Sequence, residues 1–362
     1  MKIVFIGCRS LDIVGGIESY MLNLCTALFQ RGIEPILYVG SDLKKTERMN
    51  GFTIRHVKIN KNKYINKLML SLFSTMCAIK EYPDADIYHF NANIAGLFSF
   101  LLIVMGKKTV YQGHGFEWKR EKWSSAIRFF NKLVDYFVLA INKNILMCSK
   151  EQIDYVKKIF PSKKNIMLAP GGVFLPDPIY LSKLSKPLNG IPYILFLGRI
   201  VKEKRCDLLL SAFLKIQKKV NIDLVIAGPI EDETIVSPYY DNKSVHIIGA
   251  VFGDVKNAYM KNAHIYVIPS DMEGLSISLL EAMSYGCLCV ASDIPANKEA
   301  LDDTGLYFKK GDSNDLAQTL YECITYNHKY SFMKKMAYER IKKNYDWNIL
   351  SENMIQYYYV SI

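Results

Sequence analysis

The stretch "PSDMEGLSISLLEAMSYGCLCVASDIP", residues 269–295, holds two glutamates, Glu273 and Glu281, eight positions apart. Glu273 stands in a polar loop, whereas Glu281 falls inside an apolar run that predicts a helix. We expect Ser276 to cap this helix and Gly286 to end it. A helix N-terminus can bind phosphate through its backbone N–H groups, and a carboxylate buried beside it needs a donor partner. The stretch therefore predicts a ligand-binding loop and helix.

Alternating strands and helices surround this stretch and predict an α/β protein. The apolar runs on its two sides, "AHIYVIPS" and "LCVASD", are typical of buried parallel strands. A similar alternation starts at "KIVFIG" near the N-terminus, so both halves predict doubly wound parallel sheets with helices on both faces. The expected parts are a first domain at residues 1–174, a proline-rich linker at 175–192, a second domain at 193–344 and an amphipathic helix at 345–362.

The net charge of +11 is confined to the N-terminal half of the chain. Residues 1–180 hold 25 Lys and Arg against 14 Asp and Glu, and the remaining residues hold 21 of each. A one-sided basic surface favours an anionic partner such as nucleic acid, anionic lipid or a phosphorylated substrate. A lysine-rich surface that serves only solubility is the alternative.

Cysteine usage and hydropathy predict a cytoplasmic protein that is soluble or peripheral to a membrane. The eight cysteines form no CxxC pair and stand mostly in apolar segments, as expected of buried thiols in a reducing compartment. The N-terminus opens on a strand pattern without a secretory signal, and the longest apolar run, residues 94–105, is shorter than the roughly 20 residues of a spanning helix. The aspartates of "DAD", residues 84–86, precede a strand and indicate a loop, not a metal motif.

Ligands of open α/β sheets bind outside the carboxyl ends of the strands, so the loops that follow strands are the expected binding loops. Two domains joined by a linker also leave a cleft between them. Gly15 and Gly16 could let backbone N–H groups approach an anion, although a simple tight turn explains them equally well. In "GRIVKEKR", Arg199 and Lys204 could together neutralise a diphosphate, with a solvated basic turn as the alternative.

The segment "QGHGFEWKREKW", residues 112–123, combines a histidine with aromatic and basic side chains. The glycines that flank His114 indicate an accessible position at a strand end, where a buried structural histidine would otherwise be expected. The following cluster could contact nucleic acid, a sugar or a membrane surface. It consists of Trp118, Lys119, Arg120, Lys122 and Trp123.

The motifs together resemble those of the family-4 retaining glycosyltransferases of the GT-B fold, over nearly the whole chain. "EGLSISLLEAM" resembles the family's E-x7-E region, and "GRIVKEK" resembles its G-R-x-x-x-x-K phosphate site. "GGIE" is similar to the N-terminal glycine loop, and "APGGV" to the turn that ends the first domain. "GHGFEWKREKW" is similar to a segment of bacterial rhamnosyltransferases that build surface polysaccharides.

This resemblance implies a role for each of the residues above. Arg199 and Lys204 would bind the donor diphosphate, and Glu281 would hold the ribose hydroxyls. Glu273 would hold the transferred sugar, and His114 would touch that sugar near the reacting carbon. The remaining donor contacts would come from Gly15, Gly16, Gly274, Leu275 and Ser276. The resemblance implies that no metal is needed, and that the C-terminal helix crosses back to the first domain.

The implied activity is retaining transfer of a hexose or deoxyhexose, rhamnose among them, from a nucleotide-diphosphate sugar. The acceptor would be a lipid-linked or other saccharide in bacterial O-antigen or capsule synthesis. A polyprenyl-diphosphate acceptor at the inner face of the plasma membrane would account for the basic first domain, and residues 58–76 could form a basic amphipathic contact with that surface. The alternatives are a nucleotide-sugar 2-epimerase on the same fold, or a nucleic-acid-binding module; the latter leaves Glu273 and Glu281 without a role.

Overall fold

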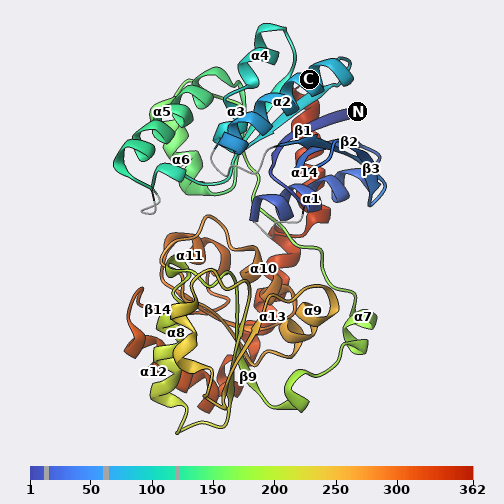
Figure 1. Cartoon of the computed structure of the whole chain (residues 1–362). Coiled ribbons are helices and arrows are strands. Elements are labelled where there is room, and N and C mark those ends of the chain that lie inside the picture. The colour runs from blue at the N-terminus through green and yellow to red at the C-terminus, as the bar shows by residue number, and fades with distance from the viewer. Residues whose placement is uncertain (12–15, 60–64, 120–122, 362) are drawn as a thin grey trace. The chain divides into compact units, whose positions relative to one another are not determined.

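The computed structural model describes residues 1–11, 16–59, 65–119 and 123–361 of the chain. These residues form two compact units (Figure 1). The first unit contains Met1–Gly172 together with Trp347–Ile362, and the second contains Val173–Asp346. The predicted α/β class is confirmed, because each unit is built around its own parallel sheet.

The first unit has an eight-stranded sheet in the order β3-β4-β2-β1-β5-β6-β7-β8. All neighbouring strands run parallel except β3, which pairs antiparallel with β4 at the edge. The strands are β1 (Lys2–Cys8), β2 (Glu34–Ser41), β3 (Thr46–Met49), β4 (Phe52–Lys58), β5 (Ile87–Asn91), β6 (Thr109–Gly113), β7 (Asn144–Met147) and β8 (Ile166–Leu168). The helices are α1 (Gly16–Phe29), α2 (Ile65–Glu81), α3 (Asn93–Gly96), α4 (Ser99–Val104), α5 (Ser125–Ile141), α6 (Lys150–Ile159) and α14 (Trp347–Ser361).

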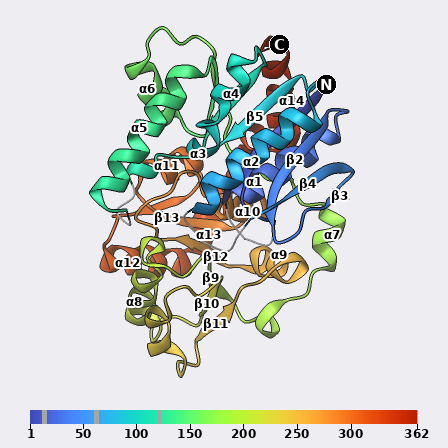
Figure 2. The ribbon, with the colours of Figure 1, turned by 45° about the horizontal axis from the view of Figure 1, so that its top comes forward.

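The C-terminal helix α14 belongs to the first unit, where it lies beside α1 (Figures 1 and 2). Trp347 is fully buried, and its ring meets that of Tyr20 edge-on at 5.3 Å between centroids. Tyr358 donates or accepts a hydrogen bond at 2.7 Å with Nδ1 of His89 in the sheet. The tail therefore buries Trp347 and Tyr358 within the first unit, the domain to which we predicted it would return.

The second unit has a six-stranded, fully parallel sheet in the order β11-β10-β9-β12-β13-β14. One hydrophobic core lies under α8 and α12, and a second core lies under α10 and α13 on the other face. The strands are β9 (Tyr193–Leu197), β10 (Asp223–Ala227), β11 (Val245–Gly249), β12 (Ile265–Ile268), β13 (Leu288–Ser292) and β14 (Leu306–Phe308). The helices are α7 (Pro178–Lys183), α8 (Cys206–Ile216), α9 (Gly253–Asn262), α10 (Ile277–Ser284), α11 (Pro295–Leu301), α12 (Ser313–Thr325) and α13 (Asn327–Asn344).

The segment predicted as a linker, residues 175–192, is instead a folded part of the second unit. It forms α7, whose first turn is capped by the Asp177 carboxylate accepting from the backbone of Ile179 at 2.7 Å. The Tyr180 hydroxyl then donates to Asp254 at 2.5 Å and accepts from Asn257 at 2.7 Å, both on α9. The prolines interrupt the apolar periodicity of this segment, but the polar contacts of Tyr180 hold it against α9.

Two segments of the first unit, residues 94–105 and 58–76, do not each form a single continuous helix. The run at residues 94–105 forms two short helices, α3 and α4, and the Ser99 hydroxyl at the start of α4 donates to the Gly96 carbonyl at the end of α3 at 2.7 Å. Residues 58–76 are not one helix, since Lys58 ends β4 and α2 begins at Ile65; residues 60–64 lie outside the described residues. Within the described ranges, no helix is both long enough and apolar enough to span a membrane.

Candidate active site

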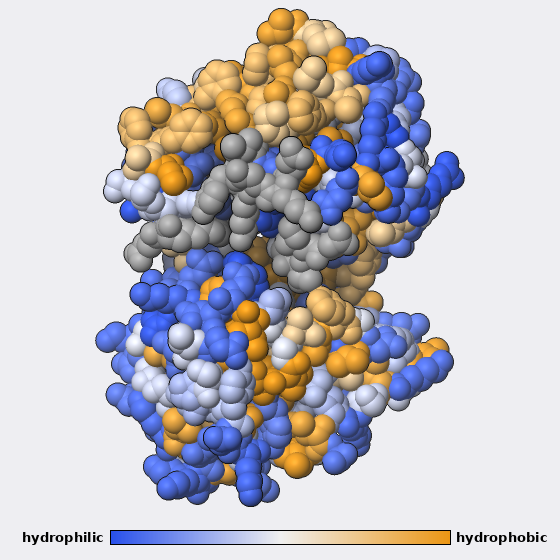
Figure 3. Space-filling view, in the orientation of Figure 1, coloured by the Kyte–Doolittle hydropathy of each residue, from blue (hydrophilic) through white to orange (hydrophobic). Residues whose placement is uncertain are grey.

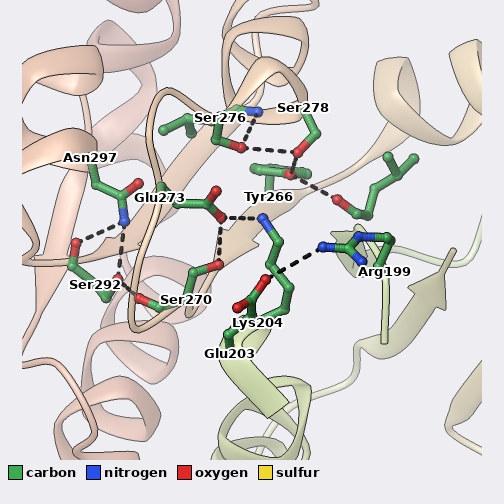
Figure 4. A network of polar contacts seen from close by, with 12 residues as sticks. Arg199, Glu203, Lys204, Tyr266, Ser270, Glu273, Ser276, Ser278, Ser292 and Asn297 are labelled. Atoms are coloured by element: carbon green, nitrogen blue, oxygen red, sulfur yellow. Dashed lines mark hydrogen bonds and ion pairs between the residues drawn. The ribbon is translucent and has the colours of Figure 1, made fainter. Parts of the chain in front are cut away.

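The candidate active site of the second unit is built at the carboxyl ends of two adjacent strands, β9 and β12. Arg199 and Lys204 follow β9, and Glu273 follows β12, so strand pairing brings side chains about 70 positions apart into one place. Figure 4 shows Lys204 reaching from its loop to the Glu273 carboxylate beneath the residues that begin α10. The loops predicted from the sequence therefore meet in space.

Lys204 and Glu273 form an ion pair, with 2.6 Å between Nζ and Oε1. The same carboxylate oxygen accepts from the Ser270 hydroxyl at 2.7 Å (Figure 4). Only 8% of the Glu273 side chain and 21% of the Lys204 side chain are exposed. Because little water surrounds the pair, its attraction is stronger than that of a surface pair and its geometry is better fixed.

Arg199 is the more exposed of the two cations, and carboxylates hold it on two sides. Its guanidinium lies 3.1 Å from Glu231 and 3.4 Å from Glu203. The backbone carbonyl of Glu203 accepts from the Asp271 amide at 3.0 Å, which ties the loop after β9 to the loop after β12. A planar guanidinium held by exchangeable surface carboxylates can turn its N–H fork to a phosphate.

Two glycines let the ends of β9 and β10 approach closely below Arg199. The backbone of Gly228 has φ of +142°, and a Cβ at this position would lie 1.8 Å from the Gly198 carbonyl oxygen. Any side chain here would therefore push the two strand ends apart. The close approach fixes the start of the loop that carries both predicted cations.

The start of α10 agrees with the prediction from the sequence. The Ser276 hydroxyl accepts from the Leu279 amide at 3.4 Å and lies 3.2 Å from the Ser278 hydroxyl. Tyr266 extends this network from β12, because its hydroxyl lies 2.8 Å from that of Ser278 and 3.3 Å from the Leu197 carbonyl. Gly274, next to Glu273, is exposed, so the backbone that precedes α10 is open to a ligand.

Glu281 has the donor partner that its position on an apolar helix demands. Its carboxylate lies 2.7 Å from the Lys256 ammonium on α9, and about a quarter of each side chain is exposed. Lys256 was not singled out from the sequence, because nothing in "DVKNAYMKN" shows that α9 lies against α10. Glu273 thus pairs with Lys204 in the loop after β9, and Glu281 pairs with Lys256 on α9.

In the first unit, His114 follows β6 and is half-buried, less accessible than its flanking glycines indicated. Its Nε2 lies 3.0 Å from the Asn91 side-chain oxygen, and its Nδ1 lies 3.4 Å from the Cys148 thiol. Tyr20 packs against the ring edge-on. Burial, assisted by the charge of Lys67, lowers the pKa of His114 to about 3, so the imidazole is neutral near pH 7.

The N-terminal glycine loop is described only in part, because Gly15 lies outside the described residues and Gly16 begins α1. In the first turn of this helix, the buried Glu18 carboxylate accepts two hydrogen bonds from Arg9, at 2.7 and 3.2 Å. Arg9 leaves the end of β1 and keeps about half of its side chain exposed. This bidentate pair places a cation at the end of β1, and no pattern in the sequence predicted it.

The predicted aromatic and basic cluster is engaged within the first unit. The Trp118 ring is half-buried and packs against Phe116, at 5.4 Å between centroids, and against Tyr155. Lys119 pairs with Glu151 at 2.5 Å, and the Trp123 indole donates to Glu117 at 3.2 Å. Arg120 and Lys122 lie outside the described residues. Stacking and pairing thus occupy side chains that we predicted to face an acceptor or a membrane.

Asp135 on α5 is a buried carboxyl group that sequence reasoning did not select. Only 5% of the residue is exposed, and burial raises the pKa of its carboxyl group to about 7. Nearby N–H groups of Asn93 and Trp118 lower this pKa, but by less than burial raises it. Within the described part of the chain, its Oδ2 atom has no hydrogen-bond partner of ordinary geometry. The described residues contain no group of three or more ligands that could hold a metal ion.

Two family models match the two halves of the chain. Residues 14–177 match Glycosyltransferase Family 4, and residues 191–325 match Glycosyl transferases group 1. Together with the two parallel-sheet units and the cationic loop after β9, these matches define the chain as a glycosyltransferase of the GT-B fold. The predicted fold class and the general enzyme class are confirmed.

Individual relatives and solved structures agree with this class. The phosphatidylinositol N-acetylglucosaminyltransferase gpi3 subunit of Schizosaccharomyces pombe is 25% identical over 362 residues, which cover 95% of this chain and 77% of that protein. The capsular polysaccharide biosynthesis glycosyltransferase CapH of Staphylococcus aureus is 28% identical over 277 residues, or 72% of this chain and 70% of that protein.

The structural matches share the fold at low sequence identity. Sucrose-phosphate synthase from Thermosynechococcus elongatus superimposes with a TM-score of 0.83 at 18% identity, over 99% of this chain and 98% of that chain. Anabaena HepE in complex with UDP-glucose gives a TM-score of 0.77 at 15% identity, over 98% of each chain.

Proposed function

We propose that the chain is a retaining, metal-independent glycosyltransferase that uses a nucleotide-diphosphate sugar. This proposal rests on one observation: Arg199, Lys204 and Glu273 lie together beside the capped N-terminus of α10. Two cations and a helix N-terminus suit a diphosphate, and a carboxylate next to them suits sugar hydroxyls. The relative solved with UDP-glucose supports a donor of this chemical class.

Each donor group has a proposed partner in the second unit. Arg199 exchanges its contacts with Glu203 and Glu231 for the diphosphate, and Lys204 adds a point charge to the same group. Glu273 keeps its contact with Lys204 and accepts hydrogen bonds from the sugar. The backbone of Gly274, Leu275 and Ser276 contacts phosphate or sugar, as do Gly15 and Gly16.

Glu281 binds the vicinal hydroxyls of the ribose with its two carboxylate oxygens. Lys256 orients this carboxylate through its contact at 2.7 Å. The neutral imidazole of His114 is suited to a hydrogen bond with the transferred sugar, because it adds no charge near the leaving diphosphate.

In the proposed reaction, an acceptor hydroxyl attacks the anomeric carbon on the face that the diphosphate leaves. The bond from this carbon to the phosphate oxygen breaks, the bond to the acceptor oxygen forms, and a donor phosphate oxygen takes the proton. Arg199 and Lys204 stabilise the charge that develops on the leaving diphosphate. These two cations supply the electrostatic stabilisation for which other enzymes use a metal ion.

The proposed acceptor is a polyprenyl-diphosphate-linked or other saccharide of bacterial surface polysaccharide synthesis, such as O-antigen or capsule. The excess of basic residues in the first half of the chain favours an anionic lipid acceptor and a peripheral position on the inner face of the plasma membrane. One relative is named for phosphatidylinositol and another for capsular polysaccharide, which supports acceptors of these kinds. The transferred sugar is proposed to be a hexose or deoxyhexose, with rhamnose as one candidate.

A donor panel tests this function. Purified protein is incubated with dTDP-, UDP- and GDP-sugars and a lipid-diphosphate saccharide, with and without a metal chelator, and products are identified by mass and by anomeric configuration. We expect one donor to be transferred with retention in the presence of the chelator. A reaction without acceptor is included, because release of an epimerised donor or sugar there would identify an epimerase instead.

Arg199→Ala should abolish transfer while leaving the fold unchanged, because the guanidinium is exposed and acts on the diphosphate. Lys202→Ala is the matched control, since Lys202 lies in the same loop and is exposed. The control variant should retain wild-type turnover. Near-normal turnover of Arg199→Ala would refute the proposed diphosphate site.

A further inference from the structure

Helix α5 in the first unit exposes a row of large hydrophobic side chains that its own core does not use. Its inner side packs into the sheet through Val134 and Val138. Its outer side carries the α5 face, in which 65% of Phe129 is exposed and more than half of Phe130, Leu133 and Tyr136. Phe137, 41% exposed, completes this face, which is thus Phe129, Phe130, Leu133, Tyr136 and Phe137.

The spacing of these residues places them on one side of the helix. A helix at the surface of a soluble protein carries mostly polar side chains on this outer side. Exposed hydrophobic residues are ordinary when they are scattered, but a contiguous group marks an interaction surface. In the second unit the exposed hydrophobic residues are spread over many elements, from Ile179 on α7 to Phe332 on α13. The α5 face is therefore a local feature of the first unit.

The short helix α4 continues this surface. Val104 at its end is 84% exposed, and Met105 beside it is 52% exposed. The end of α5 is joined to the start of α4, because the Asn142 amide donates to the Ser99 hydroxyl at 2.8 Å. Figure 3 shows the result as a band of hydrophobic residues over the part of the first unit that contains α4 and α5.

Charge distinguishes between the possible occupants of this surface. Residues 92–143, which contain α4 and α5, hold eight Lys and Arg against three Asp and Glu. Arg128 and Lys132 are the charged residues on the exposed side of α5, and the helix's single acid, Asp135, is buried. A second copy of the chain would bring like charges together, whereas an anionic bilayer offers an apolar interior beneath negative headgroups.

We propose that the α5 face inserts into the surface of an anionic lipid bilayer. Aromatic and aliphatic side chains enter the boundary between headgroups and acyl chains, while Arg128 and Lys132 remain at the level of the headgroups. This inference rests on the proposed lipid-linked acceptor, and it replaces residues 58–76 and the Trp118–Trp123 cluster as the main membrane contact. It assigns membrane binding to a helix that the sequence motifs do not include.

Vesicle sedimentation tests the proposal with the full-length chain. Binding is measured to vesicles of phosphatidylcholine alone and of phosphatidylcholine with 30% phosphatidylglycerol (about one lipid in three, chosen to resemble an anionic leaflet). The variant Phe130→Ser/Leu133→Ser should bind the anionic vesicles roughly tenfold less than the wild type, because two inserted side chains are lost. Arg128→Gln/Lys132→Gln should remove most of the preference for anionic over neutral vesicles.

Phe332→Ser is the matched control, since Phe332 is as exposed as Phe130 but lies on α13 of the second unit. Its vesicle binding should equal that of the wild type. Thermal unfolding and binding of the donor nucleotide are measured for every variant, so that a loss of folding is recognised. Equal vesicle binding by the wild type and Phe130→Ser/Leu133→Ser would overturn the proposal.

Two further outcomes separate the proposal from its alternatives. A wild-type dimer that Phe130→Ser/Leu133→Ser converts to a monomer, without a change in vesicle binding, would show that a second copy covers the α5 face and would overturn the proposal. Sugar transfer to a water-soluble acceptor by a protein that binds no vesicles would overturn this inference alone. Vesicle binding that depends on the α5 face, without sugar transfer from any donor, would support the inference and count against the proposed function.

Discussion

Replacing Lys204 with methionine should destabilise the second unit, because it leaves the Glu273 carboxylate without its ionic partner. The carboxylate lies 2.6 Å from the lysine, and only 8% of its side chain is exposed. The Ser270 hydroxyl, 2.7 Å away, would remain as a single neutral donor. Breaking a fully buried ion pair costs about 3–5 kcal/mol, and the partial exposure of this pair lets water replace some of the loss. We therefore expect a loss of about 2–3 kcal/mol in the free energy of unfolding.

The matched variant Glu273→Gln should cost less, about 1 kcal/mol, because the more exposed lysine can be hydrated and the amide oxygen still accepts a hydrogen bond. In the double variant Lys204→Met/Glu273→Gln the unpaired charge is absent. The cost of the double variant should consequently be smaller than the sum of the two single costs by about 1–2 kcal/mol.

The positions of the tryptophans allow the two units to be followed separately. All three tryptophans, Trp118, Trp123 and Trp347, belong to the first unit. Urea unfolding followed by tryptophan fluorescence therefore reports the first unit, and circular dichroism reports both. The part of the circular dichroism transition that fluorescence does not detect belongs to the second unit. Lys204→Met should shift this part to a lower urea concentration. Additive costs in the double variant, or an unchanged transition in Lys204→Met, would refute the argument that this pair is buried and coupled.

Two further predictions concern a glutamate of the second unit and an aspartate of the first. Glu281→Gln should weaken binding of the donor nucleotide about tenfold, because an amide offers one acceptor oxygen to a ribose diol. Calorimetry measures this affinity, with the exposed Glu339→Gln as the control, and equal affinities of Glu281→Gln and the wild type would exclude Glu281 from the site. The Asp135 carboxyl has a pKa of about 7 in the folded chain, above its ordinary value of 3.8, so the folded state binds more protons than the unfolded state between these pH values. Its ionisation therefore lowers stability as the pH rises through this window, by about 4 kcal/mol in all. Asp135→Asn should flatten this decline in urea titrations between pH 5 and pH 8, and identical pH profiles would show that Asp135 is not the titrating group.

Much of the fold was predictable because buried parallel strands and capped helices leave local signals. Apolar runs predicted strands in both sheets, and the Ser276 hydroxyl caps α10 as expected. The segment at 175–192 was predicted wrongly as a linker, because its fastening depends on contacts of Tyr180 with a helix more than 70 positions later. Loss of periodicity does not distinguish a free linker from a segment held by polar contacts.

The candidate site was predictable in its residues but not in its pairings. Arg199, Lys204, Glu273 and Glu281 were selected from motifs, whereas their partners Glu231 and Lys256 were not. His114 was expected to be accessible, but Asn91, Cys148 and Tyr20 surround it. Flanking glycines indicate only that the backbone can turn at this position. They do not predict which side chains of other strands and helices pack against the histidine.

The sequence by itself determined the alternating strands and helices, the loops that carry charge, and the enzyme class that these loops indicate. All of these depend on residues close together in the chain, where periodicity and spacing are visible. Only the tertiary structure decided that Lys204 pairs with Glu273, that Lys256 holds Glu281, and that the outer side of α5 stays uncovered. The physical reason is strand order: β9 lies beside β12 although two strands separate them in sequence, and a side chain's partners follow from that neighbourhood.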